Sequence, residues 1–303
     1  MRLKRAWLVL AALLSLGLVL AACGEEGPAS PTPGATPGGP RQVKTDFGVT
    51  DTEIKIGHTN VLSGSLAAVY QPVTPALQAY FEYVNREKGG VCGRRITFIF
   101  EDSQYSPTVA REKVTKLIEQ DRVLALVGDL GTPAVTGEVD YVNEQRVPLL
   151  YVSTGASKWG DYQRWPWTIG FIPDYVSEGR ILGRFANERF PNAKVGILYQ
   201  NDVLGQSFID GFRRSFRGNI VALQSHEPTA TDITSQMASL RAANIDLLFL
   251  ATAAAFSPRA FAYMGSVGWR PQVMMPTPNY PVIIANIIGG GDPAQDAVPQ
   301  GLD

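Results

Sequence analysis

The sequence predicts an α/β protein with two doubly wound lobes joined by a hinge, and three observations carry this prediction. Short apolar runs bounded by Gly, Asp or Pro are typical of buried parallel strands. Between them lie longer segments in which apolar residues recur at helical spacing. The alternation runs over residues 53–172 and then starts again, so each half can form its own parallel sheet covered by helices.

The first half is expected to alternate strands with helices. The strands are predicted over residues 54–61, 96–100, 123–127 and 149–152, and the helices over 76–88, 109–120 and 133–146. Ser106-Pro107 and Thr132-Pro133 both have the form of an N-cap residue followed by proline at the first helical position. Residues 167–172 form one more expected strand, and with Pro173 they are the natural hinge between the lobes.

The second half repeats this pattern. Helices are predicted over residues 176–189, 205–216, 232–244, 256–265 and 282–288, and strands over 195–199, 220–224, 247–251 and 273–275. In the helix over 232–244, Ile233, Met237 and Leu240 recur on one face, and we expect them to be buried.

The first 22 residues have the form of a secretory signal. Three positive charges in residues 1–5 precede an apolar run over 6–20, which is shorter than the ~20 residues of a membrane-spanning helix. Leu20-Ala21-Ala22-Cys23 resembles a bacterial lipobox, which implies cleavage before Cys23 and lipidation of that cysteine. The alternative is an uncleaved N-terminal anchor helix.

The N-terminal features predict a domain organisation and a location. Residues 24–41 are rich in Pro and Gly, which favours a semi-extended tether. We expect a signal peptide over 1–22, the lipidated cysteine and tether over 23–50, an N-terminal lobe over 51–172 and a C-terminal lobe over 173–303. Such a protein is exported and lipid-anchored to the cell membrane, on its extracellular or periplasmic face.

Composition argues against several classes of function. Of the 303 residues, 45% are hydrophobic, which is enough for a real core, and 27 Lys and Arg stand against 28 Asp and Glu. No basic block follows residue 5, which argues against a nucleic-acid partner. There is no CxxC or HExxH motif, and His58 and His226 are isolated, so we expect neither a metal site nor a cofactor. Cys92 is left as an odd exported cysteine, either a buried inert thiol or one whose partner is missing from this chain.

Several motifs occur in the order and spacing of a known family. They are Leu62-Ser63-Gly64, Gly89-Gly90-Val91-Cys92-Gly93-Arg94, Gly128-Asp129-Leu130-Gly131-Thr132, Val152-Ser153-Thr154-Gly155-Ala156-Ser157, and Tyr199-Gln200-Asn201-Asp202 followed by Gly205. On these motifs, residues 51–300 resemble the type I periplasmic-binding-protein family, in particular its leucine/branched-chain amino acid-binding branch. The resemblance implies two Rossmann-like lobes joined by three crossovers, with a ligand bound in the cleft between them.

The resemblance also implies that the chain ends near the family's second crossover. The sequence would then be C-terminally truncated and its first lobe incomplete. We expect such a lobe to expose apolar surface. A partner for Cys92 could lie in the missing segment.

The ends of the expected strands carry hydroxyls, glycines and small residues, and these ends would line the cleft. Backbone N–H groups at the helix starts favour an anion, so a carboxylate is the expected common feature of the ligand. The alternatives for the side chains at these ends are a helix cap, turn chemistry or an ordinary surface position. The resemblance implies that the ligand site in the first lobe is formed by Tyr70, Leu130, Thr132, Ser153, Thr154 and Gly155.

The second lobe departs from the leucine-binding pattern at three positions that, by the resemblance, would face the ligand. Leu204 stands where the family has a tyrosine, Ala254 lies where a second tyrosine is expected, and Asn279 replaces the acid that holds the ammonium group. Without that acid, leucine, isoleucine and valine lose their main charge partner. An uncharged or aromatic end would suit this lobe better.

These expectations lead to a substrate-binding lipoprotein of an ABC importer rather than an enzyme. It would capture a branched-chain amino acid or a related small carboxylate and deliver it to a permease in the membrane. An extracellular ligand-sensing module and a binder of aromatic carboxylates are the alternatives. An exported enzyme is disfavoured because the sequence has no G-x-S-x-G motif, no P-loop and no paired catalytic histidine.

Overall fold

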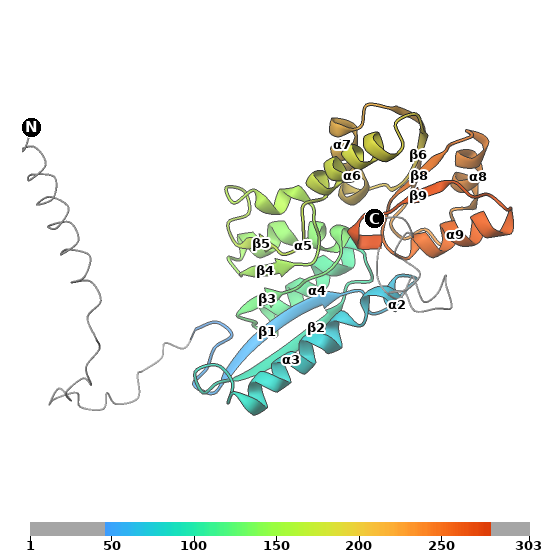
Figure 1. The fold of residues 1–303 in the computed structure, drawn as a ribbon. Coiled ribbons are helices and arrows are strands. Elements are labelled where there is room, and N and C mark those ends of the chain that lie inside the picture. Colours follow the sequence, from blue (N-terminus) through green and yellow to red (C-terminus); the bar gives the residue numbers. More distant parts are fainter. Residues whose placement is uncertain (1–45, 280–303) are drawn as a thin grey trace, which may run out of the picture. The chain divides into compact units, whose positions relative to one another are not determined.

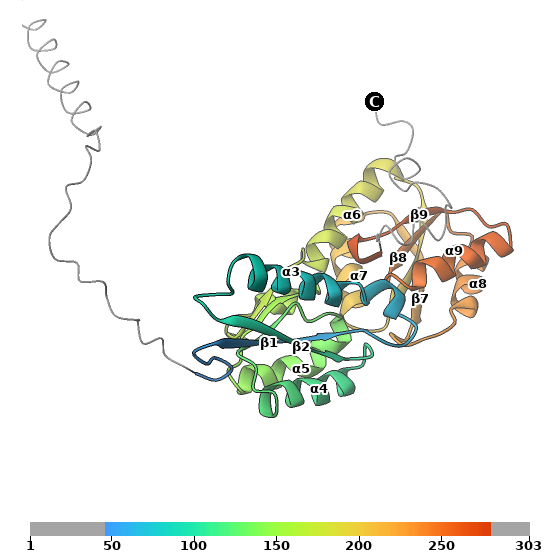
Figure 2. The same ribbon diagram turned by 90° about the horizontal axis from the view of Figure 1, so that it is seen from below.

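The computed structural model describes residues 46–279 and shows two β-sheets in which all neighbouring strands are parallel (Figure 1). Helices cover both faces of each sheet (Figure 2). We call residues 46–172, which surround the first sheet, the first lobe, and residues 173–279, which surround the second, the second lobe. The predicted fold class of two doubly wound α/β lobes is confirmed.

The first lobe contains a five-stranded sheet in the order β2-β1-β3-β4-β5. Its strands are β1 (Glu53–Asn60), β2 (Arg95–Asp102), β3 (Ala125–Val127), β4 (Leu149–Val152) and β5 (Thr168–Gly170). One face carries α3 (Val73–Glu87), and the other carries α4 (Pro107–Glu119) and α5 (Thr132–Glu144) (Figure 2). Two short helices follow β1 and β4, namely α2 (Ala67–Tyr70) and η1 (Ser157–Gly160).

The second lobe contains a four-stranded sheet in the order β7-β6-β8-β9. Its strands are β6 (Lys194–Gln200), β7 (Asn219–His226), β8 (Leu247–Ala251) and β9 (Gln272–Met274). One face carries α6 (Tyr175–Arg189) and α7 (Val203–Ser215), and the other carries α8 (Thr234–Ala242) and α9 (Phe256–Ser266) (Figure 1). The short helix η2 (Thr277–Asn279) ends the described part of the chain.

The second lobe has a dense core between α7 and its sheet. All five residues of β8 are buried, and the rings of Phe208 and Phe212 on α7 pack against that of Phe249 on β8. Burying one such side chain stabilises a fold by roughly 1.5–3 kcal/mol. Helix α6 packs tightly on α7 because a Cβ on Gly179 would come within 2.6 Å of the Phe208 carbonyl oxygen.

The expected strands are all present, and their ends lie within two residues of the predicted ones. The helices agree within three residues, and Ile233, Met237 and Leu240 are buried as expected. The sequence did not predict α2, whose four residues are too short for a periodic signal. The expected helix over 282–288, the signal, Cys23 and the tether lie outside the described residues.

The two predicted helix caps have different outcomes. Ser106 is the N-cap of α4, and its side chain accepts a hydrogen bond from the backbone N–H of Val109 at 3.4 Å. The prediction for Thr132 is wrong, because α5 begins at Thr132 and its N-cap is Gly131, which has a φ of 105°. Glycine adopts this backbone conformation without steric cost. The hydroxyl of Thr132 is therefore free to make other contacts.

Two expectations about the surface of the first lobe can be compared with the structure. Large apolar side chains are exposed along β4 and β5, among them Tyr151 (54% exposed), Ile169 (50%) and Phe171 (69%). Cys92 is exposed and free within the described residues, which rules out the alternative of a buried inert thiol. Within residues 46–279, no helix combines the length and the apolar character needed to cross a membrane.

Candidate functional site

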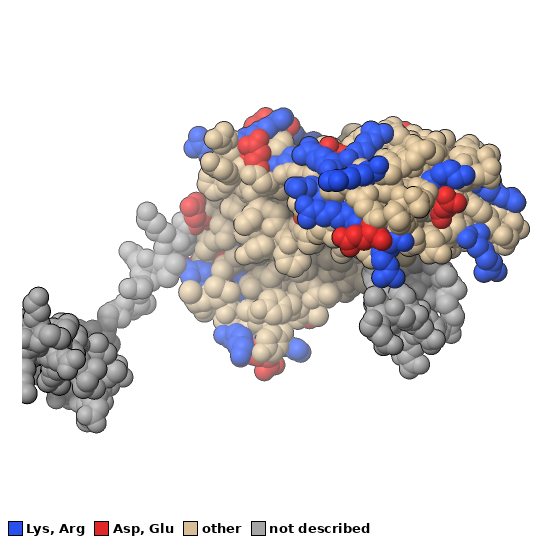
Figure 3. All heavy atoms as spheres, turned by 45° about the horizontal axis from the view of Figure 1, so that its top comes forward, with Lys and Arg blue, Asp and Glu red and all other residues tan. Residues whose placement is uncertain are grey.

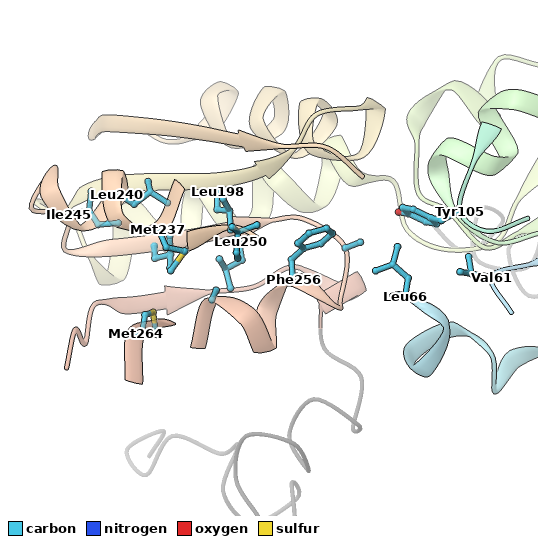
Figure 4. Close-up of a cluster of buried hydrophobic side chains, with 14 of the residues drawn as sticks. Val61, Leu66, Tyr105, Leu198, Met237, Leu240, Ile245, Leu250, Phe256 and Met264 are labelled. Atoms are coloured by element: carbon cyan, nitrogen blue, oxygen red, sulfur yellow. The ribbon is translucent and has the colours of Figure 1, made fainter. Parts of the chain in front are cut away.

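The carboxyl ends of strands from both lobes come together and form the candidate ligand site. Among the hydrogen bonds that cross between the lobes, one runs from the side-chain Nε2 of Gln200 at the end of β6 to the hydroxyl of Tyr105 after β2, at 3.2 Å. A cluster of buried apolar side chains also crosses, running from Val61 and Leu66 in the first lobe to Phe256 in the second (Figure 4). This is the edge at which ligands bind in open parallel sheets.

A pair of buried threonine hydroxyls lies at the centre of the first lobe's side. Thr132 and Thr154 are each 1% exposed, and their Oγ1 atoms are 2.6 Å apart. The loops that carry them are held together by a parallel bridge between Leu130 and Ser153, whose backbone N–H donates to the carbonyl oxygen of Asp129 at 2.8 Å. The structure therefore brings together the predicted residues after the third and fourth strands, with Ser153 contributing its backbone.

Tyr175 closes over these threonines from the start of α6. Its backbone N–H donates to the carbonyl oxygen of Gly155 at 2.7 Å, and a Cβ on Gly155 would lie only 2.6 Å from the tyrosine ring. Burial raises the pKa of Tyr175, while the backbone N–H of Gly155 and the hydroxyls of Thr154 and Thr132 oppose the rise. Three hydroxyls thus form one group, and the predicted Gly155 supplies the space for the third.

Two stacked tyrosines line the neighbouring part of the site. The rings of Tyr70 and Tyr105 lie 6.1 Å apart with an angle of 16° between their planes. The glycine at Gly131 makes room for Tyr105, since a Cβ there would be 2.8 Å from the ring. Burial raises the pKa of Tyr70, and the backbone N–H of Ala254 in the second lobe opposes the rise. Two predicted residues, Tyr70 and Ala254, therefore meet across the cleft.

The second lobe contributes a polar pair at the end of β6. Gln200 is fully buried, and its Nε2 also donates to the Oδ2 of Asp202 at 2.6 Å. Asp202 is the N-cap of α7, and its Oδ1 accepts from the backbone N–H groups of Leu204 at 2.9 Å and Gly205 at 3.4 Å. Burial raises the pKa of Asp202, and these hydrogen bonds oppose the rise. Among the described residues, the Oε1 of Gln200 has no hydrogen-bond partner.

A lysine stands near this pair on the first lobe's side. The Nζ of Lys158 donates to the Oγ1 of Thr136 at 2.7 Å and lies 4.7 Å from the centre of the Trp159 ring. Burial lowers the pKa of Lys158 to about 8, although the charges of Asp140 and Asp202 favour its protonated form. Lys158 therefore loses its proton more readily than an ordinary lysine, at a position near the cleft.

Two predicted ligand residues face the interior of the second lobe instead. Leu204 is 2% exposed and packs with Phe208 in the apolar cluster beneath α7. Asn279 is fully buried, and its Nδ2 donates to the carbonyl oxygens of Leu250 at 2.8 Å and Thr252 at 2.6 Å. Its Oδ1 accepts from the hydroxyl of a buried serine of α9 at 3.0 Å. In the structure neither residue offers a ligand a free group, and we propose that both have structural roles.

The sequence interpretation did not single out Tyr105, Tyr175 or Lys158 as site residues. A lone tyrosine or lysine near a strand or helix end does not reveal where its side chain points. The available signal was indirect: Gly131 and Gly155 lie in the quoted motifs, and the structure shows that each makes room for one of the two rings. By contrast, the predicted loop of Ser63 and Gly64 is found at the mouth of the site, where it lines a hollow.

A hollow of about 240 Å³ opens at this mouth, between the two lobes. Residues of both lobes line it, namely Val61, Ser63, Gly64, Ser65, Leu66, Gln104, Tyr105, Thr229 and Thr231. It lies beside the stacked tyrosines, because Tyr105 is one of its lining residues. Within residues 46–279, no group of three or more His, Cys, Asp or Glu side chains is arranged to hold a metal ion.

Both histidines have structural partners. The Nδ1 of His58 lies 3.0 Å from the carbonyl oxygen of Val127, and the Nε2 of His226 lies 2.6 Å from the hydroxyl of Thr252. The ring of His226 also packs on that of Phe256, with their centres 3.7 Å apart. Burial lowers the pKa of His226 to about 4, so this ring is neutral at pH 7.

Three solved structures show how similar the fold is to that of known proteins. The fatty acid ABC transporter substrate-binding protein from Thermomonospora curvata matches with a TM-score of 0.71 at 24% identity, over 80% of this chain and 62% of that one. LivJ from Streptococcus pneumoniae, a branched-chain amino acid transporter substrate-binding protein in complex with isoleucine, gives 0.69 at 21% identity, over 78% and 68%. A solute binding protein of an ABC transporter from Rhodopseudomonas palustris BisB5, in complex with 3,4-dihydroxybenzoic acid, gives 0.64 at 19% identity, over 74% and 61%.

The sequence itself matches a family model. Among curated proteins, none matches the chain closely. The chain spans less than two thirds of the length of the Thermomonospora curvata and Rhodopseudomonas palustris proteins. The model described as "Periplasmic binding protein" matches residues 53–296, which include both lobes. This match and the two parallel-sheet lobes of the structure show that the chain belongs to the periplasmic binding protein family, with the type I fold.

Proposed function

We propose that this protein is the substrate-binding component of an ABC importer and that it captures a small carboxylate in the cleft between its lobes. The single observation that carries the proposal is the cluster of three buried hydroxyls, those of Thr132, Thr154 and Tyr175, near the start of α5. Any hydroxyl proton that is not used within this group of three needs an acceptor. A carboxylate supplies acceptors only, and the helix N-terminus adds a favourable dipole.

The body of the ligand is better suited by an uncharged group than by an α-ammonium. The second lobe's side of the apolar cluster presents Ala253, Ala255 and Phe256. Asn279 uses its whole amide within the lobe, and Asp202 already accepts hydrogen bonds at both oxygens. An ammonium group would therefore be buried without a free charge partner, which is costly. We favour aliphatic or aromatic carboxylates over leucine, isoleucine and valine.

The similar structures are consistent with this range of ligands. The titles of the three matches name a fatty acid transporter, a complex with 3,4-dihydroxybenzoic acid and a complex with isoleucine. The proposal includes delivery of the ligand to a membrane permease. It also includes export and lipid anchoring through Cys23 after removal of residues 1–22, for which the N-terminal pattern is the support.

A thermal-shift screen of amino acids, aromatic acids and short aliphatic acids tests the ligand class. A ligand present at 100 times its Kd adds ~2.7 kcal/mol of stability, which raises the melting temperature measurably. We expect carboxylates without an ammonium group to give the largest shifts, and Thr132→Val to reduce them. Thr115→Val is the matched control, because the hydroxyl of Thr115 donates to the carbonyl oxygen of Arg111 within α4 and is not part of the site. No shift in any class would count against a solute-binding function.

The lipid anchor is tested by mass spectrometry of the N-terminal peptide after expression in a bacterium. The proposal predicts a peptide that begins at Cys23 and carries acyl chains. Cys23→Ser should give a protein that is released from the membrane fraction. An intact N-terminus with residues 1–22 still present would contradict this part of the proposal.

A further inference from the structure

One surface of the second lobe is rich in arginine. Helices α6 and α7 border a shallow hollow of about 770 Å³, whose lining includes a single acidic residue, Glu188. Figure 3 shows Lys and Arg side chains gathered over this part of the molecule. We call this surface the α6–α7 basic face and define it by the arginines that line the hollow, Arg180, Arg184, Arg213, Arg214 and Arg217.

Most of this positive charge is not neutralised within the described residues. Arg214 pairs with Asp210 of the same helix, at 2.6 Å. The other four arginines make no ion pair within residues 46–279. A helix C-terminus favours cations, which accounts for Arg213 and Arg214 in the last turn of α7. It does not account for Arg180 and Arg184, which lie in the middle of α6.

Helix α6 also exposes apolar side chains. Ile181 is 65% exposed and Phe185 is 45% exposed, and each follows directly in the sequence on an arginine of the basic face. The guanidinium of Arg189 stands 6.0 Å from the centre of the Phe185 ring. A helix surface that combines arginines with exposed aliphatic and aromatic groups is suited to the interfacial region of a membrane. Guanidinium groups fit phosphate oxygens in a bidentate manner, and apolar side chains enter between the lipids.

The basic face leaves the ligand site free. Both α6 and α7 begin at the cleft, at Tyr175 and Val203, and run away from it. The face occupies the middle of α6 and the C-terminal end of α7. The tight packing of these helices at Gly179 and Gly183 holds the arginines on one rigid surface.

We infer that the α6–α7 basic face docks onto an anionic lipid surface. Its positive charge complements lipid phosphates, and Ile181 and Phe185 supply the apolar contact that an acidic protein surface would not require. The inference does not depend on the identity of the ligand or on lipidation of Cys23.

Co-sedimentation of the full, unlipidated chain with vesicles tests the inference. Vesicles of phosphatidylcholine alone are compared with vesicles that contain 30% phosphatidylglycerol, so that any contribution of the N-terminal segment to neutral vesicles is measured separately. Each arginine at an anionic surface contributes about fivefold in partitioning, so that Arg180→Gln, Arg184→Gln and Arg213→Gln together should reduce the preference for anionic vesicles by about a hundredfold. Ile181→Ser with Phe185→Ser should weaken binding at high salt as well.

A matched control removes the same number of charges from the first lobe. Arg86→Gln, Lys88→Gln and Arg95→Gln change exposed side chains that make no ion pair in the described residues, and should leave the preference intact. Equal binding to both kinds of vesicle, or an equal loss in the control, would overturn the inference. Displacement by inorganic phosphate at constant ionic strength would also overturn it, because it would indicate a site for a free anion.

Discussion

The two sides of the cleft differ in what they offer a ligand. The first lobe presents the contacting hydroxyls of Thr132 and Thr154, and Tyr175 at the start of α6 closes over them. The second lobe presents small and apolar groups, and its polar side chains Gln200 and Asn279 bond mostly to other protein groups. The contrast indicates that the first lobe anchors the carboxylate and the second lobe selects the rest of the ligand.

The largest expected effect comes from adding a side chain at Gly155, where the Tyr175 ring needs the space. In Gly155→Ala, the new Cβ would lie 2.2 Å from the Pro173 carbonyl oxygen and 2.6 Å from the Tyr175 ring. Overpacking of this kind costs about 1–3 kcal/mol of stability. The shift of Tyr175 should also abolish ligand binding. Gly160→Ala is the control, because nothing lies within 4 Å of its added Cβ. Equal melting temperatures for the two variants would refute the packing argument.

The next largest effect tests the threonine hydroxyls that would bind the carboxylate. Thr132→Val keeps the side-chain shape and removes the hydroxyl that lies 2.6 Å from Thr154. A hydrogen bond to a charged group contributes roughly 1.5–3 kcal/mol, so affinity for a carboxylate should fall by about 10- to 100-fold in calorimetric titration. Unchanged affinity would mean that the hydroxyl pair does not contact the ligand.

On the second lobe's side, His226 predicts a pH dependence of stability. Burial lowers the pKa of His226 from 6.5 to about 4 in the folded protein. Between these values the unfolded chain takes up a proton that the folded chain does not, so the free energy of unfolding falls as the pH drops from 6.5 to 4. The contribution of this residue is about 3 kcal/mol. Denaturant unfolding at several pH values should show a flatter profile for His226→Gln than for the unaltered protein, and parallel profiles would disprove the assignment.

The smallest effect concerns Leu204. Because this side chain is 2% exposed and packs beneath α7, Leu204→Met should cost less than about 1.5 kcal/mol and leave ligand affinity unchanged. Titration and thermal unfolding of the one variant measure both quantities. A changed ligand preference would return Leu204 to the cleft, where the sequence interpretation had placed it.

The elements of the fold could be predicted because each is encoded locally. The run Leu247–Ala251 is apolar throughout and forms a fully buried strand, and Ser106 before Pro107 caps α4 as expected. The start of α5 was predicted wrongly because a glycine with positive φ replaced a side-chain cap. This same geometry leaves the Thr132 hydroxyl available, so the expectation of a ligand-facing threonine stands as a proposal.

The second lobe's site was harder to predict for a physical reason. A shift of one residue along a helix or loop decides whether the side chain of Leu204 or Asn279 faces the cleft. Sequence spacing alone does not determine that shift. The amide of Asn279 bridges β8 and α9, which only the three-dimensional arrangement reveals. Tyr105 and Tyr175 come from segments far apart in sequence. Each ring lies where a glycine, with no Cβ, leaves room for it.

The most direct test of the contrast between the lobes is a calorimetric comparison of leucine with 4-methylpentanoate, which is leucine without its ammonium group. The two ligands share the carboxylate and the aliphatic end, so any difference reports on the ammonium alone. The account predicts that 4-methylpentanoate binds more tightly, by about tenfold or more, because the second lobe offers the ammonium no free charge partner. Tighter binding of leucine would contradict it and would restore an amino acid as the ligand.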